Sequence, residues 1–357
     1  MNQMSSEPNV AGYPTNRAPL RGTSVESSGL PWTKNGLELE YPARFDTLAR
    51  LGHIPFLFWI VDALRPRTIV ELGVGRGNSY FAFLQAARQL GLDVRCFGID
   101  PWLGNQGEET HRELCGYHDP LYGAFSTLVR SSYDAATPYL LDKSIDLLHV
   151  AVTPSSNLTH DALERWLVRM SSRGVVVFHD INGSVGPTAA VRLWGNLRQR
   201  YPTFEFLHGN GLGVAYVGGD PLCEPLKLLF DGTSRANSNH IRAYFARLGI
   251  SVHEHVVLRD LQVRLANADL RVRALENEVA RGAEAMHCRS PDLRDAQTGQ
   301  NFRQQMALIM RLQREVSTLN RKRIAWEQIL QSTSWRITAP LRWVVIKVRW
   351  LVSKAVD

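Results

Sequence analysis

The segment best suited to chemistry is VELGVGRGNS, at residues 70–79. It holds three glycines at alternate positions: Gly73, Gly75 and Gly77. Glycine allows the backbone angles of a tight turn and lets a ligand approach the main chain, so a strand that contains Glu71 can pass through this turn into a helix. Asn78 stands where a dinucleotide-binding turn would have its last glycine, which disfavours a nicotinamide cofactor.

A second acidic residue, Asp100, ends the next apolar run, in FGIDPW. It lies 25 residues after Gly75, close to the spacing of about 20 at which an acid binds the hydroxyls of a ribose. A glycine turn alone is weak evidence, because many α/β proteins use one for structural reasons. With Glu71 before it and Asp100 after it, the turn predicts a cofactor of the nucleoside type.

An alternation of strands and helices must position these residues. Between Thr68 and about Asp220, short apolar runs alternate with stretches of helical periodicity, which predicts a doubly wound α/β domain with a parallel sheet. The predicted strands cover residues 68–73, 94–100, 144–152 and 174–180. The predicted helices cover residues 78–91, 159–171 and 188–201. A terminal antiparallel hairpin is expected at 204–218, where two apolar runs flank a turn of Gly and Asn.

Over residues 38–220 the sequence resembles the class I S-adenosylmethionine-dependent methyltransferases. The segments that carry the resemblance are VELGVGRGNSYFAF, HDPLYGAFSTLVRSSYDAA, SIDLLH, RGVVVFHDIN, RLWGNLRQRYPTFEFLHG and GLGVAYVG. They look like a bacterial branch associated with polysaccharide biosynthesis. The resemblance implies a Rossmann-like sheet and S-adenosyl-L-methionine as the cofactor. The C-terminal segment STSWRITAPLR also resembles segments near the ends of bacterial glycosyltransferases of surface-polysaccharide pathways.

The resemblance also implies roles for individual residues. Four of them would hold the methionine part of the cofactor: Glu71, Gly73, Gly75 and Gly77. Asp100 would hold the ribose, and Ser132 falls where such enzymes contact the adenine. Asp180 falls where related metal-using members place a ligand, and His179 would lie beside it at the carboxyl end of the strand, within the acceptor cleft. These two residues are the candidate catalytic residues.

One stretch departs from the family pattern. In the family, the strand that corresponds to DLLH leads into an Asp-Gly-x-His element that helps to organise a divalent ion or the acceptor. This chain aligns without a gap from His149 to Trp166, which places Ala151 and Val152 at the Asp-Gly pair and Pro154 at the His. These side chains can neither coordinate a metal nor move a proton, so too few ligands are left for a hard cation and no metal is expected.

Methyl transfer to a hydroxyl group still requires removal of a proton. His179 is the best candidate for the base, because imidazole titrates near neutral pH and Asp180 follows it. The alternative, in which His179 is a hydrogen-bonded structural histidine at a strand end, stays open. His118 and His160 are weaker candidates, since each fits a solvated loop or the start of a helix.

The composition separates a neutral part of the chain from a basic part. Residues 253–357 hold 18 Lys and Arg against 11 Asp and Glu, which accounts for the whole net charge of +7. A basic excess confined to an appendage indicates what that appendage contacts, such as anionic lipid or nucleic acid. The four cysteines are far apart and lack zinc-binding spacing, which fits a reducing cytoplasm. Residues 1–37 have the composition of a disordered leader without a secretory signal.

The region after the predicted domain is expected to be helical. Residues 221–252 would form a connector, and residues 253–332 would form coiled-coil segments with a polar break at 282–300. The first heptad seam consists of Leu258, Leu261, Leu265, Ala268, Val272, Leu275 and Val279. The second consists of Ile309, Leu312, Val316, Leu319, Trp326 and Leu330, with Arg323 at one seam position. These seams favour a homo-oligomer, and a helical hairpin folded on its own chain stays the alternative.

The C-terminal segment, residues 333–357, is rich in Trp, Val and Leu, with Lys or Arg every few residues. The charges interrupt the apolar run too often for a helix that spans a bilayer. An amphipathic helix of this composition suits the membrane surface, which predicts a peripheral contact with the inner face of the plasma membrane. A helix docked on the protein's own core is the alternative.

Three functions are compatible with these features. The favoured one is a cytoplasmic S-adenosylmethionine-dependent O-methyltransferase that modifies a sugar hydroxyl of a surface polysaccharide or of its precursor, such as a nucleotide sugar. The second is a methyltransferase fold without turnover that acts as an assembly scaffold in glycan biosynthesis. The third, a nucleic-acid modifier, is disfavoured because the core is neutral and the tail aromatics cluster with Val and Leu.

Overall fold

The computed structural model describes residues 36–46, 50–151, 158–182, 188–230, 235–287 and 296–331. Several predictions fall outside these residues: almost all of the leader, Val152 and Pro154, the centre of the polar break, and the C-terminal segment 333–357. In the part of the chain that the structure describes, no helix is long and apolar enough to cross a membrane.

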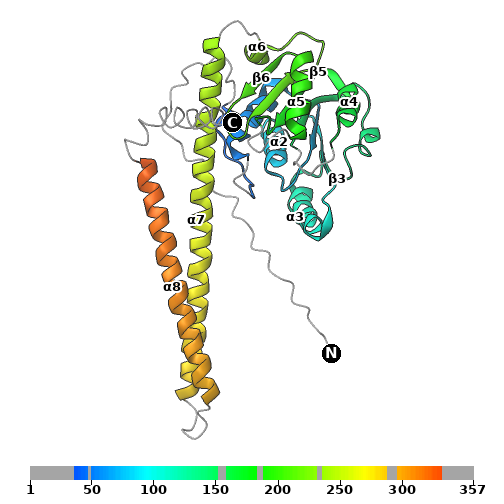
Figure 1. Ribbon diagram of the computed structural model, residues 1–357. Helices are drawn as coiled ribbons and strands as arrows, with labels where there is room; N and C mark the ends of the chain where they lie inside the picture. Colours follow the sequence, from blue (N-terminus) through cyan, green and yellow to red (C-terminus); the bar gives the residue numbers. More distant parts are fainter. Residues whose placement is uncertain are drawn as a thin grey trace, which may run out of the picture.

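A twisted sheet forms the centre of the globular part (Figure 1). Its strands are β1 (Thr68–Leu72), β2 (Arg95–Asp100), β3 (Ser126–Arg130), β4 (Ile145–Val150), β5 (Met170–His179), β6 (Thr203–Phe206) and β7 (Leu212–Tyr216). They lie in the order β3-β2-β1-β4-β5-β7-β6. Strands β1 to β5 are parallel, whereas β7 runs antiparallel to both β5 and β6. The predicted doubly wound sheet with its terminal hairpin is confirmed.

Helices cover both faces of this sheet. They are α1 (Ile54–Leu64), α2 (Asn78–Gln89), α3 (Gly104–Tyr122), α4 (His160–Val168), α5 (Ala189–Arg200), α6 (Glu224–Phe230), α7 (Arg235–His287) and α8 (Ala296–Gln331). One buried cluster contains side chains of α1, α2 and α7, and a second contains side chains of α4 and α5. The helices predicted from periodicity correspond to α2, α4 and α5, which end one to three residues earlier than expected.

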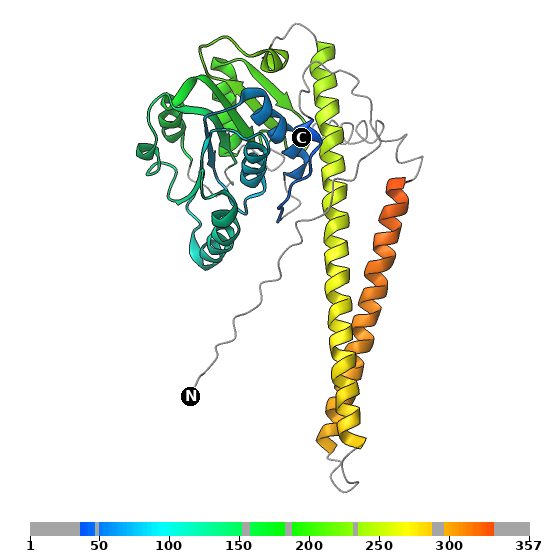
Figure 2. The ribbon, with the colours of Figure 1, turned by 180° about the vertical axis from the view of Figure 1, so that it is seen from behind.

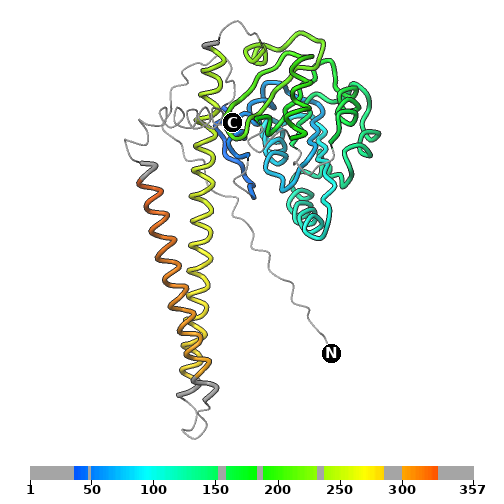
Figure 3. The backbone as a smooth tube through the Cα atoms, in the orientation of Figure 1, coloured from blue at the N-terminus to red at the C-terminus, as the bar shows by residue number. Residues whose placement is uncertain are grey.

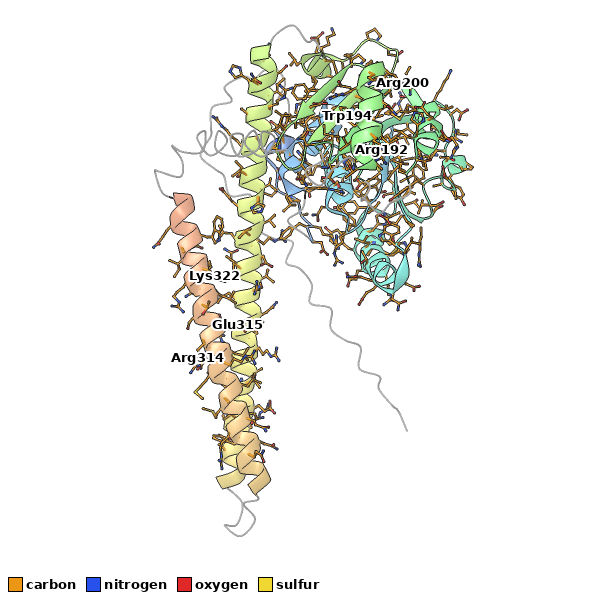
Figure 4. The ribbon with its side chains drawn as sticks, in the orientation of Figure 1. Arg192, Trp194, Arg200, Arg314, Glu315 and Lys322 are labelled. Atoms are coloured by element: carbon orange, nitrogen blue, oxygen red, sulfur yellow. The ribbon has the colours of Figure 1, made fainter. Side chains whose placement is uncertain are left out.

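Local sequence explains where the helices of the second face begin. The Thr159 hydroxyl accepts a hydrogen bond from the Ala162 N–H at the start of α4 (3.1 Å), which satisfies one of the unpaired donors of the first turn. The Thr188 hydroxyl does the same at the start of α5 (3.3 Å). Figure 4 labels Trp194 on α5 together with Arg192 and Arg200, and this indole is buried against the sheet.

Helix α7 is 53 residues long and lies in two environments. Its first part contributes four side chains to the same core as α1: Ile241, Phe245, Val252 and Val256. Gly249 lies so close to the short 3-10 turn η2 (Leu51–His53) that an added Cβ would be 2.1 Å from the Gly52 carbonyl oxygen. The rest of α7 continues past the domain (Figure 3). The helix therefore crosses the predicted boundary at residue 252 without a break, and much of the predicted connector is core.

Helix α8 runs antiparallel to α7, and Figures 1 and 2 show the two side by side from opposite directions. Five seam residues are buried: Leu261, Val272, Ile309, Leu312 and Leu319. Gln305 and Gln313 of α8 donate hydrogen bonds to Glu278 and Glu276 of α7, both at 3.0 Å. The seams thus pair within one chain, as in the hairpin alternative. The homo-oligomer stays a prediction.

The substitution Gly249→Ala is expected to destabilise the protein, although alanine normally stabilises a helix interior by about 0.5–1 kcal/mol relative to glycine. The added methyl group would meet the Gly52 backbone, and overpacking of this kind typically costs about 1–3 kcal/mol. Thermal unfolding of the full chain should therefore show a lower Tm.

The control is Gly282→Ala in the same helix, where an added Cβ would lie within 4 Å of no described atom. This variant should be at least as stable as the wild type. Equal Tm values for the two variants would show that α7 does not pack against η2 at Gly249.

Candidate functional site

The candidate site lies at the carboxyl ends of the parallel strands. Strand β1 pairs with β2 on one side and with β4 on the other, so the order of the sheet reverses here. In open α/β sheets, ligands bind in the crevice outside the carboxyl ends of the strands at such a reversal. Four predicted site residues lie at this edge: Glu71, Asp100, His179 and Asp180.

The glycine turn connects β1 to α2. Gly73, Gly75 and Gly77 have φ values of 88°, 55° and 91°, a backbone conformation that residues with a Cβ rarely adopt. A Cβ on Gly77 would lie 2.5 Å from the ring of Phe81, so this position also needs glycine for packing against α2. A Cβ on Gly75 would be within 4 Å of no described atom. The main chain at Gly75 therefore faces open space that a ligand can enter.

Asp100 is bonded to the glycine turn. Its Oδ2 accepts a hydrogen bond from the Gly75 N–H (2.9 Å) and its Oδ1 accepts one from the Trp102 N–H (2.8 Å). The Trp102 indole N–H in turn donates to the Gly75 carbonyl (3.0 Å). Each carboxylate oxygen has a further lone pair, so Asp100 can hold the turn and still accept from ribose hydroxyls. Sequence reasoning missed Trp102, although it stands two residues after Asp100.

Glu71 lies beneath the turn and is fully buried. The Ser79 hydroxyl donates to its Oε1 (3.2 Å), and Nδ1 of His149 lies 3.1 Å from its Oε2. Glu71 and His149 are direct neighbours in the register of β1 and β4. Nδ1 of His149 and Oε2 of Glu71 are as close as the atoms of an ion pair, but their geometry is not that of a hydrogen bond. The predicted contact of Glu71 with the methionine part of the cofactor stays a prediction.

His179 belongs to a cluster of four histidines, here called the histidine cluster: His53, His149, His179 and His208. Ring centroids are 4.8 Å apart between His149 and His179, 5.1 Å between His53 and His179, and 4.5 Å between His53 and His208. His179 is 1% exposed, and neither of its ring nitrogens has a hydrogen-bond partner among the described residues. His179 is therefore buried, as a structural histidine would be. It lacks the hydrogen bond that this alternative predicted.

Burial keeps three members of the histidine cluster, His53, His179 and His208, neutral. Desolvation lowers the pKa of His53 and His179 well below 6.5, and the neighbouring histidines lower both further. Burial also lowers the pKa of His208 to about 4, against the opposing effect of its hydrogen bond with the Gly52 carbonyl (3.1 Å). At neutral pH these three imidazoles carry no charge.

Asp180 is paired with an arginine and not with a histidine of the cluster. Its Oδ2 accepts a hydrogen bond from Arg50 (2.6 Å), and a second nitrogen of Arg50 donates to the Ala151 carbonyl (2.7 Å). Because the Asp180 carboxylate is bonded to Arg50, it does not orient the His179 ring. Sequence reasoning missed Arg50, since nothing near it in the chain indicates a contact 130 residues away.

The remaining candidates lie apart from this edge or on its rim. Ser132 is exposed in the turn after β3, where its hydroxyl accepts from the Ala135 N–H (3.3 Å). His160 is exposed at the start of α4, as expected. The expectation of a solvated His118 is wrong: it is buried in α3, and its Nε2 is 2.7 Å from the Ser126 hydroxyl. In the described ranges, no group of three or more His, Cys, Asp or Glu is arranged to hold a metal ion.

Residues 70–181, which contain the glycine turn, Asp100 and the strand end at Asp180, match the family model described as a methyltransferase domain. This segment is a methyltransferase domain. The match confirms the methyltransferase prediction for this segment, and the order of its strands agrees with the predicted class I type. S-adenosylmethionine is the methyl donor that a domain of this type implies. It does not assign roles to individual residues, which stay predictions.

The similarity to known proteins extends beyond residues 70–181. The chain is 35% identical over 243 residues to the uncharacterized protein y4gI of Sinorhizobium fredii, a match that covers 65% of this chain and 26% of the relative. The chain thus spans about a quarter of that relative's length. Solved structures with a similar fold include the SAH-bound methyltransferase PaMTH1 of Podospora anserina (13% identity, TM-score 0.38, 46% of this chain and 77% of that one). Another is the spermidine synthase of Thermotoga maritima (14% identity, TM-score 0.38, 52% and 67%).

Acid is expected to destabilise the protein through the histidine cluster. Because the folded-state pKa values of His53, His179 and His208 lie below 6.5, the unfolded chain binds more protons than the folded one below about pH 6.5. The stability is complete above that pH and falls as the pH falls, by about 1.4 kcal/mol per pH unit for each histidine. Thermal unfolding measured from about pH 7.5 to about pH 5 should show this decline.

The substitution His179→Leu should reduce the slope of this decline by one proton, because it removes one group that charges on unfolding. His160→Gln, at an exposed position, is the control and should leave the slope unchanged. Equal slopes in the wild type and in His179→Leu would contradict this account of the cluster.

Proposed function

We propose that this chain is an S-adenosylmethionine-dependent O-methyltransferase whose acceptor is a sugar hydroxyl of a surface polysaccharide or of its precursor. The observation that carries the proposal is the closed network of Asp100, Gly75 and Trp102 next to the open space over the glycine turn. A domain that binds no ligand would not need an acidic side chain bonded to the turn at the point where the strand order reverses.

The residues of the turn fit the cofactor. The exposed main chain at Gly75 can approach the methionine part, and Asp100 retains lone pairs for the ribose. Ser132, exposed on the rim after β3, is within the same edge of the sheet and is the proposed contact of the adenine. When bound, the cofactor supplies a methyl group on a sulfonium centre, which is a good leaving group.

The chain must align the acceptor and remove its proton. Alignment of reacting groups contributes up to about 7–11 kcal/mol, and a general base contributes about 10²- to 10⁴-fold. Of the two predicted catalytic residues, Asp180 is the better placed, because its side chain is 28% exposed whereas His179 is 1% exposed. In this proposal Asp180 accepts the proton of the acceptor hydroxyl, and the neutral His179 forms part of the buried wall behind it.

Sequence likeness supports a sugar acceptor. Residues 38–220 resemble a branch associated with polysaccharide biosynthesis, and STSWRITAPLR resembles segments of glycosyltransferases from the same pathways. The second candidate, a scaffold without turnover, is favoured by one observation: the end of β4 offers the side chain of Ala151, which is buried and has no acid. Binding of the cofactor separates the two candidates.

The first test is a calorimetric titration of the full chain with S-adenosylmethionine. Asp100→Asn should weaken binding by about tenfold or more, because hydrogen bonds to a charged acceptor are worth about 1.5–3 kcal/mol. Asp142→Asn is the matched control, since this exposed carboxylate pairs with Arg169 away from the turn. Absence of binding in the wild type would exclude the proposed cofactor site and favour the scaffold.

The second test measures transfer of a radiolabelled methyl group to UDP-glucose, GDP-mannose and dTDP-rhamnose. Asp180→Asn should lower kcat by about 10²-fold or more while cofactor affinity changes by less than about twofold, because the amide cannot accept the proton. His179→Leu should lower kcat much less. If Asp180→Asn retains full activity, Asp180 is not the base.

A further inference from the structure

Arg50 connects the ends of two neighbouring strands at the candidate site. One terminal nitrogen donates to Oδ2 of Asp180, just after β5 (2.6 Å), and the other donates to the carbonyl of Ala151, just after β4 (2.7 Å). The end of β4 thus contributes a main-chain acceptor where its side chain offers no acid. The guanidinium has five N–H groups in a fixed planar arrangement, so two bonds in different directions determine its orientation.

Both partners have an uncommon backbone conformation. Arg50 has φ 64° and Asp180 has φ 60°, in the left-handed region that side chains other than glycine rarely adopt. Contacts with other parts of the chain hold both residues in this conformation. The Asp180 N–H donates to the Gly211 carbonyl (3.0 Å), and Gly52, two residues after Arg50, packs against Gly249 of α7. Strained residues that the surrounding structure enforces tend to cluster at functional sites.

The pair is partly buried and still accessible. The side chains of Arg50 and Asp180 are 23% and 28% exposed, so their attraction is screened less than that of a surface ion pair and an acceptor can reach the carboxylate. The charge of Arg50 also acts on His53, His179 and Tyr133, and burial keeps all three neutral. Among the described residues, Arg50 is the cation paired with Asp180.

We propose that Arg50 is a positioning residue, which fixes the direction of the Asp180 carboxylate toward the acceptor. The inference rests on the proposed function, in which Asp180 is the base. The charge-assisted hydrogen bond from Arg50 holds the carboxylate, and the second bond, to the Ala151 carbonyl, prevents the guanidinium from turning away. Arg50 thus ties the Asp180 side chain to the end of β4.

The first experiment needs no acceptor. The full chain is labelled with carbon-13 at the aspartate carboxyl groups, and the Asp180 resonance, assigned from its loss in Asp180→Asn, is recorded at neutral pH. In Arg50→Met this resonance should move from its wild-type position and report a more mobile side chain in relaxation measurements, because the carboxylate loses the guanidinium that holds it, and Arg50→Lys should lie between the two. Arg165→Met, which removes the exposed partner of Asp134, is the control and should leave the Asp180 resonance unchanged. An unchanged Asp180 resonance in Arg50→Met would overturn the proposal.

The second experiment separates this proposal from the proposed function. With an acceptor that the wild type methylates, Arg50→Met should lower kcat by about 10²-fold with little change in cofactor affinity, and Arg50→Lys should restore about tenfold of that loss. Full activity of Arg50→Met would overturn the positioning role while leaving the methyltransferase in place. A changed Asp180 resonance in a protein that methylates none of the probes would support the Arg50–Asp180 pairing and count against the proposed reaction.

Discussion

The packing of the turn at residues 50–53 is the constraint on which the rest of the site depends. Gly249 of α7 and Gly52 meet backbone to backbone, Leu51 is completely buried, and the His208 ring is hydrogen-bonded to the Gly52 carbonyl. These contacts come from three separate parts of the chain and leave the turn little freedom. Because Arg50 begins this turn, its guanidinium is directed onto the ends of β4 and β5. The helix that extends into the hairpin is thus also part of the support of the site.

The histidine cluster lowers the stability of the folded protein. A buried polar atom without a hydrogen bond typically costs about 1–3 kcal/mol, and both ring nitrogens of His149 and His179 lack one among the described residues. Charged imidazoles would cost far more in this position, so the cluster is tolerable only while it is neutral. Burial keeps His53, His179 and His208 neutral, and the side chains of Glu71, Asp100, Asp180 and Arg50 lie around them at the same edge. The electrostatics of the site therefore depend on burial as much as on the charged residues.

Much of the fold was predictable from sequence because its signals are local. Strands β1, β2, β4 and β5 are apolar runs, and α2, α4 and α5 show helical periodicity between them. Helix α1 was missed because it is buried on nearly every side and so lacks an amphipathic pattern. Helix α3 was missed because it is largely polar and contains Pro120. The heptad seams of α7 and α8 were found, but a seam specifies a partner helix and not the chain that supplies it, which is why the hairpin and the oligomer were left open.

The site was predictable only where its residues lie close together in the chain. Glu71, the glycine turn and Asp100 follow one another at spacings that their chemistry requires. The absence of an acid after β4 could also be predicted from Ala151, but the contacts of Arg50 with this strand end could not, because Arg50 lies 101 residues before Ala151 and 130 before Asp180. His179 looked like a base because sequence shows its place at a strand end and not its surroundings. In the proposed function, the buried His179 is part of the wall of the site, and its more exposed neighbour Asp180 is the group that can meet an acceptor.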